Sequence, residues 1–369
     1  MGVNDTLRKL AKAQGFARVG FCRADPPATA PMLAEYLAQG RHGTMDWLAR
    51  NPEWRADIRT RYPWAQSYLM LSIDYPADLP RLPDKSVIPM IARYARGRDY
   101  HGVYEAPLLA LEKSIKASFG PGTKALWYQD TGPFLERALA QQAGLGWVGK
   151  NTMLIDPARG SWTLLALVVT SLEVEPDTPV TDHCGTCTRC LDACPTKAFP
   201  APYQLDARRC ISYLNIEHEG AVPEPLREPM GQWLVGCDIC NEVCPWNSKA
   251  PKASPELTPD FAGLTLSRIL TGKPDQLRKR IDGTPLVRVG VDRLRRNAAV
   301  IAGNLRDPSL IASLEQAAHD DDRGLRECVY WALRQYPREL GRGPLARAQK
   351  YEVEDDLRDQ IIETLQEWV

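Results

Sequence analysis

Eight of the ten cysteines lie in the short stretch between Cys184 and Cys244. A disulfide-stabilised protein of this length would spread its cysteines more widely, whereas this crowding is typical of metal ligands. Thiolate ligands survive best in a reducing compartment, so we expect a cytoplasmic protein. The cysteine segment therefore predicts a metal-binding redox protein rather than a disulfide scaffold.

The spacing of these cysteines is that of a bacterial ferredoxin with two 4Fe-4S clusters. Three thiolates separated by two-residue gaps can wrap three corners of one cluster, and the following Cys-Pro turns away to serve the other cluster. The second run has only two closely spaced cysteines before its own Cys-Pro, so Cys210 is the natural replacement. Crossed ligation then assigns Cys184, Cys187, Cys190 and Cys244 to cluster 1, and Cys194, Cys210, Cys237 and Cys240 to cluster 2.

Zinc is the alternative occupant, because it also uses pairs of Cys-x-x-Cys. Zinc sites seldom need three cysteines within seven residues and a Cys-Pro ending, and here that ending occurs twice. The remaining two cysteines, Cys22 and Cys328, lie in apolar patterns and are predicted to be small buried hydrophobic residues.

Residues 1–172 alternate between strand-like and helix-like patterns, which predicts an α/β domain. The expected strands are Arg18–Phe21, Tyr68–Ile73, Ala125–Tyr128 and Leu164–Thr170, and the expected helices are Leu108–Ser118 and Phe134–Ala143. The longest apolar run, from Trp162 to Val169, is too short to cross a bilayer and predicts a buried strand, so we expect no membrane contact.

Breaker-rich stretches at residues 173–180 and 251–259 divide the remainder into a ferredoxin-like 4Fe-4S domain at 173–250 and an α-helical domain at 251–369. Apolar residues in the last domain recur at helical spacing. Two segments, beginning at Arg296 and Arg326, align at an offset of 30 residues. This weak repeat predicts stacked helical pairs of the HEAT type.

Several motifs between about residue 15 and residue 250 resemble those of epoxyqueuosine reductases. The order of the motifs along the chain is part of the resemblance. The motifs are His42-Gly-Thr-Met45-Asp-Trp47-Leu48, Arg93-Tyr94-Ala-Arg96-Gly-Arg98-Asp99-Tyr100-His101, Gln129-Asp130-Thr131-Gly132-Pro133, Glu136-Arg137-Ala138, Gly144-Leu-Gly-Trp-Val-Gly-Lys150-Asn151 and Arg209-Cys210-Ile211-Ser212-Tyr213. The resemblance implies a cobalamin-dependent iron–sulfur enzyme. Such an enzyme reduces epoxyqueuosine to queuosine at the wobble position of tRNA anticodons.

The resemblance also implies roles for individual residues. Asp130 would be the proton donor, placed at the end of an apolar strand, although a helix-capping role for Asp130 or Thr131 is the simpler alternative. The family positions near cobalamin are matched by Arg55, Asp130, Leu154, Ser212 and Asp238. The string beginning at Asp99 and His101 lacks the glycine of cobalt-ligating Asp-x-His-x-x-Gly motifs, so we expect no protein histidine on cobalt.

The chain has no net charge, with 46 basic and 46 acidic residues, so tRNA would have to bind a local patch. The clearest one comprises Arg278, Lys279, Arg280, Arg288, Arg293, Arg295 and Arg296. We expect Arg293, Arg295 and Arg296 to contact phosphates, against the alternative of a solvated helix face. Trp47, Tyr94 and Tyr100 are candidate walls for the unpaired base.

Two other functions fit the cysteine pattern. Another corrinoid iron–sulfur reductase, of the reductive dehalogenase type, would share the cofactors, and a plain electron-transfer ferredoxin module would bind no corrin. The enzyme interpretation also requires an external low-potential electron donor, and we expect the protein to act as a monomer.

Overall fold

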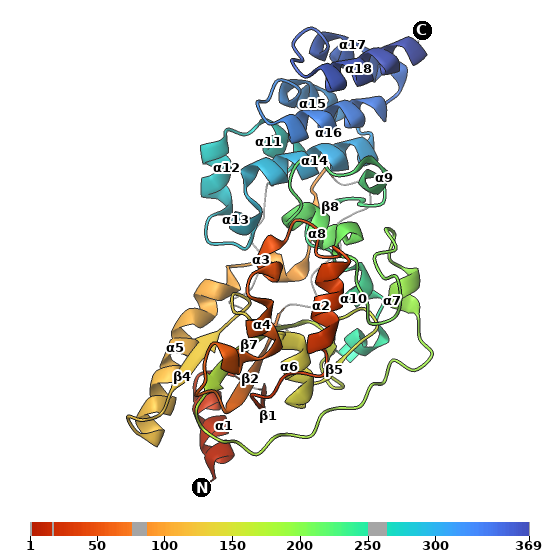
Figure 1. Ribbon diagram of the computed structural model, residues 1–369. Coiled ribbons are helices and arrows are strands. Elements are labelled where there is room, and N and C mark those ends of the chain that lie inside the picture. The colour runs from red at the N-terminus through yellow and green to blue at the C-terminus, as the bar shows by residue number, and fades with distance from the viewer. Residues whose placement is uncertain (1, 17, 76–86, 250–263, 369) are drawn as a thin grey trace. The chain divides into compact units, whose positions relative to one another are not determined.

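The computed structural model describes residues 2–16, 18–75, 87–249 and 264–368 (Figure 1). Contacts divide the chain into two compact units. Unit 1 comprises Met1–Leu79, Arg98–Ala207 and Asp238–Thr258, and unit 2 comprises Pro80–Gly97, Arg208–Cys237 and Pro259–Val369. This division differs from the three consecutive domains expected from the sequence, because stretches before and within the cysteine segment pack with the C-terminal helices.

Unit 1 is built on a four-stranded sheet with strand order β1-β2-β7-β4. Its main strands and helices are β1 (Arg18–Arg23), β2 (Ser67–Asp74), β4 (Ala125–Tyr128), β7 (Thr163–Thr170), α1 (Val3–Ala13), α5 (Tyr100–Phe119) and α6 (Glu136–Gln142). All four predicted strands are confirmed. Each neighbouring pair is antiparallel, so the alternation of helices and strands in the sequence does not produce a parallel sheet here.

Helices cover both faces of this sheet (Figure 1). Because side chains alternate along a strand, Leu69 and Leu71 of β2 pack on one face and Tyr68 and Met70 on the other. Helices α1 and α5 cover the first face, and α6 covers the second. The β2 strand is buried along nearly its whole length, as expected for a central strand with two covered faces.

The approach of α6 to the sheet depends on a glycine in β1. A Cβ atom on Gly20 would lie 2.0 Å from the carbonyl oxygen of Ala143, so only glycine allows this contact. Helix α6 begins at Glu136, two residues later than predicted. Phe134 instead packs its ring against Tyr128, with ring centroids 4.8 Å apart.

The other elements of unit 1 are short. They are α2 (Ala30–Ala38), α3 (Asp46–Ala49), α4 (Pro52–Ala56), β5 (Trp147–Val148), β6 (Leu154–Ile155), α7 (Arg189–Asp192) and α10 (Ile239–Glu242). Strands β5 and β6 form a small hairpin that follows α6. The cysteine loops adjoin α7 and α10, which contact each other.

Unit 2 is mainly helical, as predicted. Its elements are β3 (Met90–Ile91), α8 (Ile211–Ile216), α9 (Glu224–Arg227), β8 (Trp233–Val235), α11 (Leu266–Thr271), α12 (Pro274–Ile281), α13 (Leu286–Val289), α14 (Val291–Leu305), α15 (Ile311–Ala317), α16 (Arg323–Arg334), α17 (Arg338–Ala348) and α18 (Asp355–Glu367). The two segments that align at a 30-residue offset lie in α14 and α16, which pack against each other. Among the described residues, no helix is both long and apolar enough to span a membrane.

Replacement of Leu111 by alanine tests the packing of α5 on the sheet. Leu111 is fully buried, whereas Leu109 on the same helix is 40% exposed. Leu111→Ala should lower the free energy of unfolding by about 2–5 kcal/mol, because it leaves a cavity. Leu109→Ala should change it by less than about 0.5 kcal/mol. Urea denaturation measures both, and equal effects of the two substitutions would contradict this packing.

Candidate functional site

Four cysteines of unit 1 surround one cavity of about 80 Å³. They are Cys184, Cys187, Cys190 and Cys244, the set that crossed ligation assigns to cluster 1. The first three lie on the loop before and within α7, and the fourth follows α10. The other lining residues are Lys150, Asn151, Ile155, His183, Arg189, Pro245 and Trp246.

The cavity fits a cluster better than a single zinc ion. Four cysteines on one zinc ion would place every sulfur about 2.3 Å from it and leave no space between them. Among the described residues, no group of cysteine, histidine or acidic side chains converges as the ligands of one metal ion do. Burial raises the pKa of the Cys190 and Cys244 thiols, and neighbouring thiolates raise it further. A positively charged iron–sulfide core would relieve that repulsion.

The cluster 2 cysteines come from both units. In unit 1, Cys194 follows α7 and Cys240 lies in α10. In unit 2, Cys210 precedes α8 and Cys237 follows β8. The Ala198 amide donates to Cys194 Sγ at 3.4 Å, as amides near cluster ligands commonly do. Ligation of one cluster by these four residues stays a prediction from their spacing.

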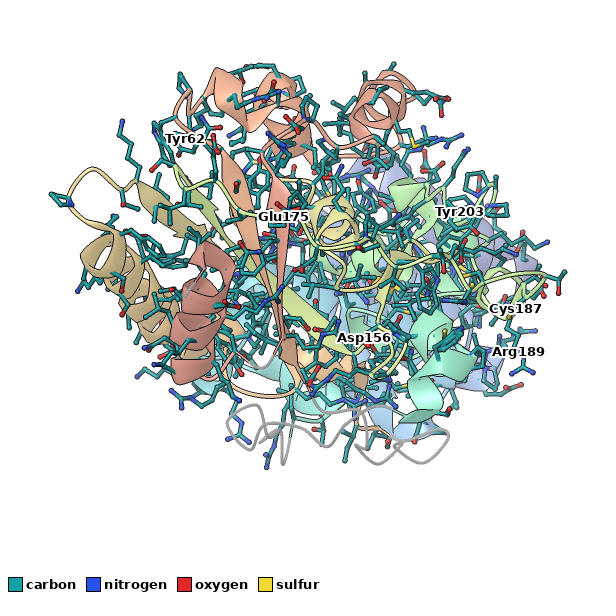
Figure 2. All side chains as sticks on the ribbon, turned by 90° about the horizontal axis from the view of Figure 1, so that it is seen from below. Tyr62, Asp156, Glu175, Cys187, Arg189 and Tyr203 are labelled. Atoms are coloured by element: carbon teal, nitrogen blue, oxygen red, sulfur yellow. The ribbon has the colours of Figure 1, made fainter. Side chains whose placement is uncertain are left out.

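Local hydrogen bonds shape the cysteine loop. The Cys184 amide donates to Asp182 Oδ1 at 2.6 Å, and the Cys187 amide donates to the Cys184 carbonyl at 3.0 Å. Gly185 adopts a positive φ of 49°, which lets the loop turn between its first two cysteines. Figure 2 shows Cys187 and Arg189 on this loop, with Tyr203 on a neighbouring segment. The Tyr203 hydroxyl donates to Asp182.

Asp130 lies two residues beyond β4, as predicted, in a left-handed conformation with φ of 59°. That conformation is uncommon outside glycine and is retained where neighbouring contacts hold it. The Asp130 amide donates to Glu136 Oε1 at 2.9 Å, and the Tyr100 hydroxyl donates to Asp130 Oδ2 at 2.9 Å. The Asp130 side chain is still 57% exposed. Its carboxyl is therefore oriented by the protein and open to a ligand.

Asp130 does not cap the helix that follows. The residue preceding α6 is Leu135, which makes no side-chain cap. The carboxyl of Asp130 contacts α5 instead, because Tyr100 and His101 both lie in the first turn of α5. His101 Nε2 is 3.9 Å from Asp130 Oδ2, and His101 Nδ1 is 2.9 Å from Asp99 Oδ1. The sequence did not predict these contacts. It supplied only the two motifs that contain Tyr100, His101 and Asp130.

Arg55 links two segments beside the Asp130 turn. Its Nη1 donates to the Gly132 carbonyl at 3.1 Å, and its Nη2 donates to the Trp47 carbonyl at 3.3 Å. Arg55 Nε is buried without a hydrogen-bond partner, and so are His101 Nε2 and both polar atoms of the Gln129 amide. Buried polar atoms of this kind normally have partners. These atoms fit a bound group that is rich in amides, such as the corrin ring implied by the family resemblance.

The other expected cofactor contacts lie in or next to regular elements. Leu154 in β6 is buried, and Asp238, which immediately precedes α10, is 2% exposed. Ser212 lies in α8 of unit 2. The structure contains no contact that tests their roles.

The structure corrects the prediction for Arg295 and Arg296. Both are buried in α14, with 9% and 2% exposure. Arg296 donates to the carbonyls of Leu214, His218 and Gly220 at 2.6–2.7 Å, and burial lowers its pKa to about 10. Arg295 donates to the Leu270 carbonyl and pairs with Asp320. These guanidinium groups stabilise unit 2 and are not available to phosphates.

Arg293 is partly exposed and donates to the carbonyls of Val289 and Glu217. Its phosphate contact stays a prediction. Cys22 and Cys328 are buried, at 4% and 0% exposure, as expected. Burial raises the pKa of Cys22 to about 12, so its thiol remains protonated.

Two family models match parts of the chain. Residues 183–247 match the 4Fe-4S double cluster binding domain, and residues 55–131 match the model described as "Epoxyqueuosine reductase QueG, DUF1730". The epoxyqueuosine reductase of Xanthomonas campestris pv. campestris is 40% identical over 345 residues, covering 89% of this chain and 95% of that protein. The Pseudomonas aeruginosa enzyme is 37% identical and covers 90% and 94%.

Solved structures of epoxyqueuosine reductases resemble the whole chain. One, bound to an epoxyqueuosine-modified tRNA-Tyr stem loop, has a TM-score of 0.91 and 30% identity, covering 99% of this chain and 98% of that chain. The Streptococcus thermophilus enzyme has a TM-score of 0.88 and 28% identity, and both chains are covered completely. Fold, cysteine spacing and cavity together define an iron–sulfur protein with a double-cluster domain.

The chain belongs to the epoxyqueuosine reductase family. The similarity to its relatives extends over about nine tenths of the chain, far beyond the cysteine segment. An electron-transfer ferredoxin module would account for that segment alone.

Glu136 gives the site a measurable pH dependence. Burial, and then the charge of Asp130, raises the pKa of Glu136 to about 8. A carboxyl whose pKa rises on folding stabilises the fold at low pH and loses that contribution as pH rises towards 8. Glu136→Gln keeps an oxygen acceptor for the Asp130 amide but cannot ionise. Its melting temperature should match the wild type at pH 5 and exceed it at pH 8.5.

The exposed residue Glu53 serves as the control in the same thermal scans. Glu53→Gln should follow the wild-type pH dependence. An unchanged pH dependence in Glu136→Gln would show that Glu136 is ionised in the folded protein at neutral pH.

Proposed function

We propose that this protein reduces epoxyqueuosine to queuosine at the wobble position of tRNA anticodons, with two 4Fe-4S clusters and cobalamin as cofactors and Asp130 as the proton donor. The observation that carries the proposal is the Asp130 turn, which holds an exposed carboxyl in a constrained conformation beside unpartnered buried polar atoms. A relative of 30% identity has been solved with an epoxyqueuosine-modified stem loop, which supports the substrate.

The reaction removes the epoxide oxygen as water and leaves a carbon–carbon double bond. It consumes two electrons and two protons, and breaks both carbon–oxygen bonds. When bound, cobalamin supplies a low-potential centre that accepts single electrons from the clusters and delivers them to carbon. An external low-potential donor would refill the clusters.

Asp130 is suited to protonate the departing oxygen. Its carboxyl reaches solvent in the free protein, and a substrate base stacked over the turn would exclude that water and favour the neutral acid. The Tyr100 hydroxyl donates to one carboxyl oxygen and so orients the carboxyl, whose side chain stays exposed. In the Bacillus subtilis epoxyqueuosine reductase, which is 29% identical, a catalytic aspartate loop has been solved swung out of the active site. This neighbour supports the assignment of a catalytic role to an aspartate on a loop, which we propose for Asp130.

Polar and backbone contacts from four further residues would hold the corrin ring. We assign these contacts to Arg55, Leu154, Ser212 and Asp238, and the unpartnered Arg55 Nε is available to a ring amide. Burial lowers the pKa of Arg55, and a polar partner would oppose that shift.

The crossed pattern would place Cys194, Cys210, Cys237 and Cys240 on cluster 2. We further infer that the helices of unit 2 form a HEAT-like array and that the protein works as a monomer in the cytoplasm.

The tRNA backbone would bind the exposed part of the basic stretch. Arg278, Lys279 and Arg280 of α12 are exposed, and so is Arg288, whereas Arg295 and Arg296 are buried. Arg278 pairs with Asp275, and Arg288 pairs with Glu217. Exposed pairs of this kind are weak and can be exchanged for phosphate contacts.

Replacement of Asp130 tests the catalytic assignment. Reconstituted protein with cobalamin, a low-potential reductant and tRNA carrying epoxyqueuosine should remove one oxygen from the nucleoside, as mass spectrometry measures. Asp130→Asn should slow that loss at least about 100-fold, because general acid catalysis contributes roughly that much. Its tRNA affinity and cluster absorbance should be unchanged. Asp46→Asn, at an exposed position of α3, is the matched control.

No oxygen loss by the wild-type protein would refute the proposed function. Full activity of Asp130→Asn would refute only the role of Asp130.

Charge reversal separates the surface arginines from the buried ones. The double variant Arg278→Glu and Lys279→Glu should weaken tRNA binding about tenfold and reduce the slope of log affinity against log salt by about 1–2. Lys113→Glu, at an exposed position of α5, should leave binding unchanged. Arg296→Glu should unfold unit 2, because it places a carboxylate against three carbonyl oxygens. Equal tRNA affinity of the double variant and wild type would contradict the assigned surface.

A further inference from the structure

The side chain of Lys150 forms hydrogen bonds to the backbone of the cysteine loop. It follows β5, and its backbone carbonyl accepts a hydrogen bond from the Tyr203 amide at 3.0 Å. Its Nζ donates to the Gly185 carbonyl at 2.6 Å and to the Cys187 carbonyl at 3.0 Å. The same side chain lines the cavity surrounded by the four cluster 1 cysteines. The ammonium group is therefore held at the loop carbonyls, beside the cavity that the four cysteines line.

Aromatic rings pack together beside the same cavity. Trp147 is 1% exposed, and its ring packs edge-on against Trp246 and His183, with centroids 5.0 and 5.1 Å away. Both Trp246 and His183 line the cavity. Lys150 is partly buried, and beside a partly buried group the effective dielectric constant is lower than in water, so dissolved salt screens the charge less. A fixed charge then has a larger effect on its neighbours than it would at the surface.

The other charges near the loop are placed differently. Arg189 lines the cavity but is exposed in α7, so solvent screens its charge. Asp182 accepts hydrogen bonds from the Cys184 amide and the Tyr203 hydroxyl, which partly compensate its negative charge. Lys150, by contrast, bonds directly to two carbonyls of the loop.

One-electron reduction of a 4Fe-4S cluster with four thiolate ligands adds one negative charge and makes or breaks no bond. A neighbouring positive charge stabilises the reduced form more than the oxidised form, and so raises the reduction potential. From this geometry we propose that the charge of Lys150 sets the reduction potential of cluster 1 and thereby makes it reducible by the external donor. The inference rests on the iron–sulfur part of the proposed function.

Three substitutions separate the charge of Lys150 from its hydrogen bonds. Lys150→Met keeps much of the volume and loses both properties. Lys150→Gln keeps an N–H donor for the loop carbonyls without the charge, and Lys150→Arg keeps the charge. Lys12→Met, at an exposed position of α1, is the control. The measurement is a potentiometric titration of the anaerobically reconstituted full chain, followed by the electron paramagnetic resonance signal of the reduced clusters, with iron content measured in parallel.

At a fixed potential, Lys150→Met and Lys150→Gln should each lower the ratio of reduced to oxidised cluster 1 about tenfold, as expected for one partly buried charge. For a one-electron couple that is a shift of about 59 mV to more negative potential. Lys150→Arg and Lys12→Met should titrate like the wild type. The signal of cluster 2 should not move by as much, which identifies the cluster affected.

A wild-type potential in Lys150→Gln would overturn the proposal and assign Lys150 to loop positioning through hydrogen bonds. A shift of equal size in Lys150→Arg would overturn it as well. If Lys150→Met fails to bind iron, the comparison of Lys150→Gln with Lys150→Arg still decides. The absence of any iron–sulfur signal from the wild-type protein would refute the proposed function instead, so the two failures are distinguishable.

Discussion

The placement of four cysteines around one cavity is the constraint on which the redox site depends. Cys184, Cys187 and Cys190 approach Cys244 from a loop more than fifty residues away in sequence, and burial raises the pKa of the Cys190 and Cys244 thiols. A positively charged iron–sulfide core inside the cavity, or cations around it, would stabilise the charged form of these ligands. The loop is held accordingly from both sides, by Asp182 at its start and by Lys150 at its carbonyls.

The buried arginines show what a charge pattern in a sequence leaves undetermined. Arg296 and Arg326 occupy equivalent places in the 30-residue repeat, and both bind backbone carbonyls. Arg296 donates to the carbonyls of His218 and Gly220. Arg326 donates to the carbonyls of Asp320 and Asp321. An arginine that satisfies carbonyls and one that binds phosphates have the same side chain, and only burial separates them. The repeat was visible in the sequence, whereas Arg296 was assigned to phosphates and instead binds carbonyls.

Local patterns predicted the elements of unit 1 better than their connections. Apolar runs placed β4 at Ala125–Tyr128 without error, since a buried strand needs only local alternation and β-branched or aromatic residues. The antiparallel pairing of that strand with β7 and the late start of α6 at Glu136 depend on contacts between distant segments. Spacing alone identified the cysteines around the cavity, because cluster geometry fixes the spacing of its ligands. It did not identify Tyr100 or Glu136 as partners of Asp130, because neither contact follows a periodic pattern.

Asp130, the proposed proton donor, and Lys150 lie on one continuous segment of the chain. From β4 the backbone enters the Asp130 turn, continues through α6, and reaches Lys150 directly after β5. Helix α6 packs on the sheet and contacts both strands of the hairpin, and Gly20 allows its close approach to β1. Because a packed helix resists small displacements, the turn and the lysine keep fixed positions relative to the same sheet. Electron supply and proton supply would then share one rigid support, while the exposed carboxyl of Asp130 remains free to meet the substrate.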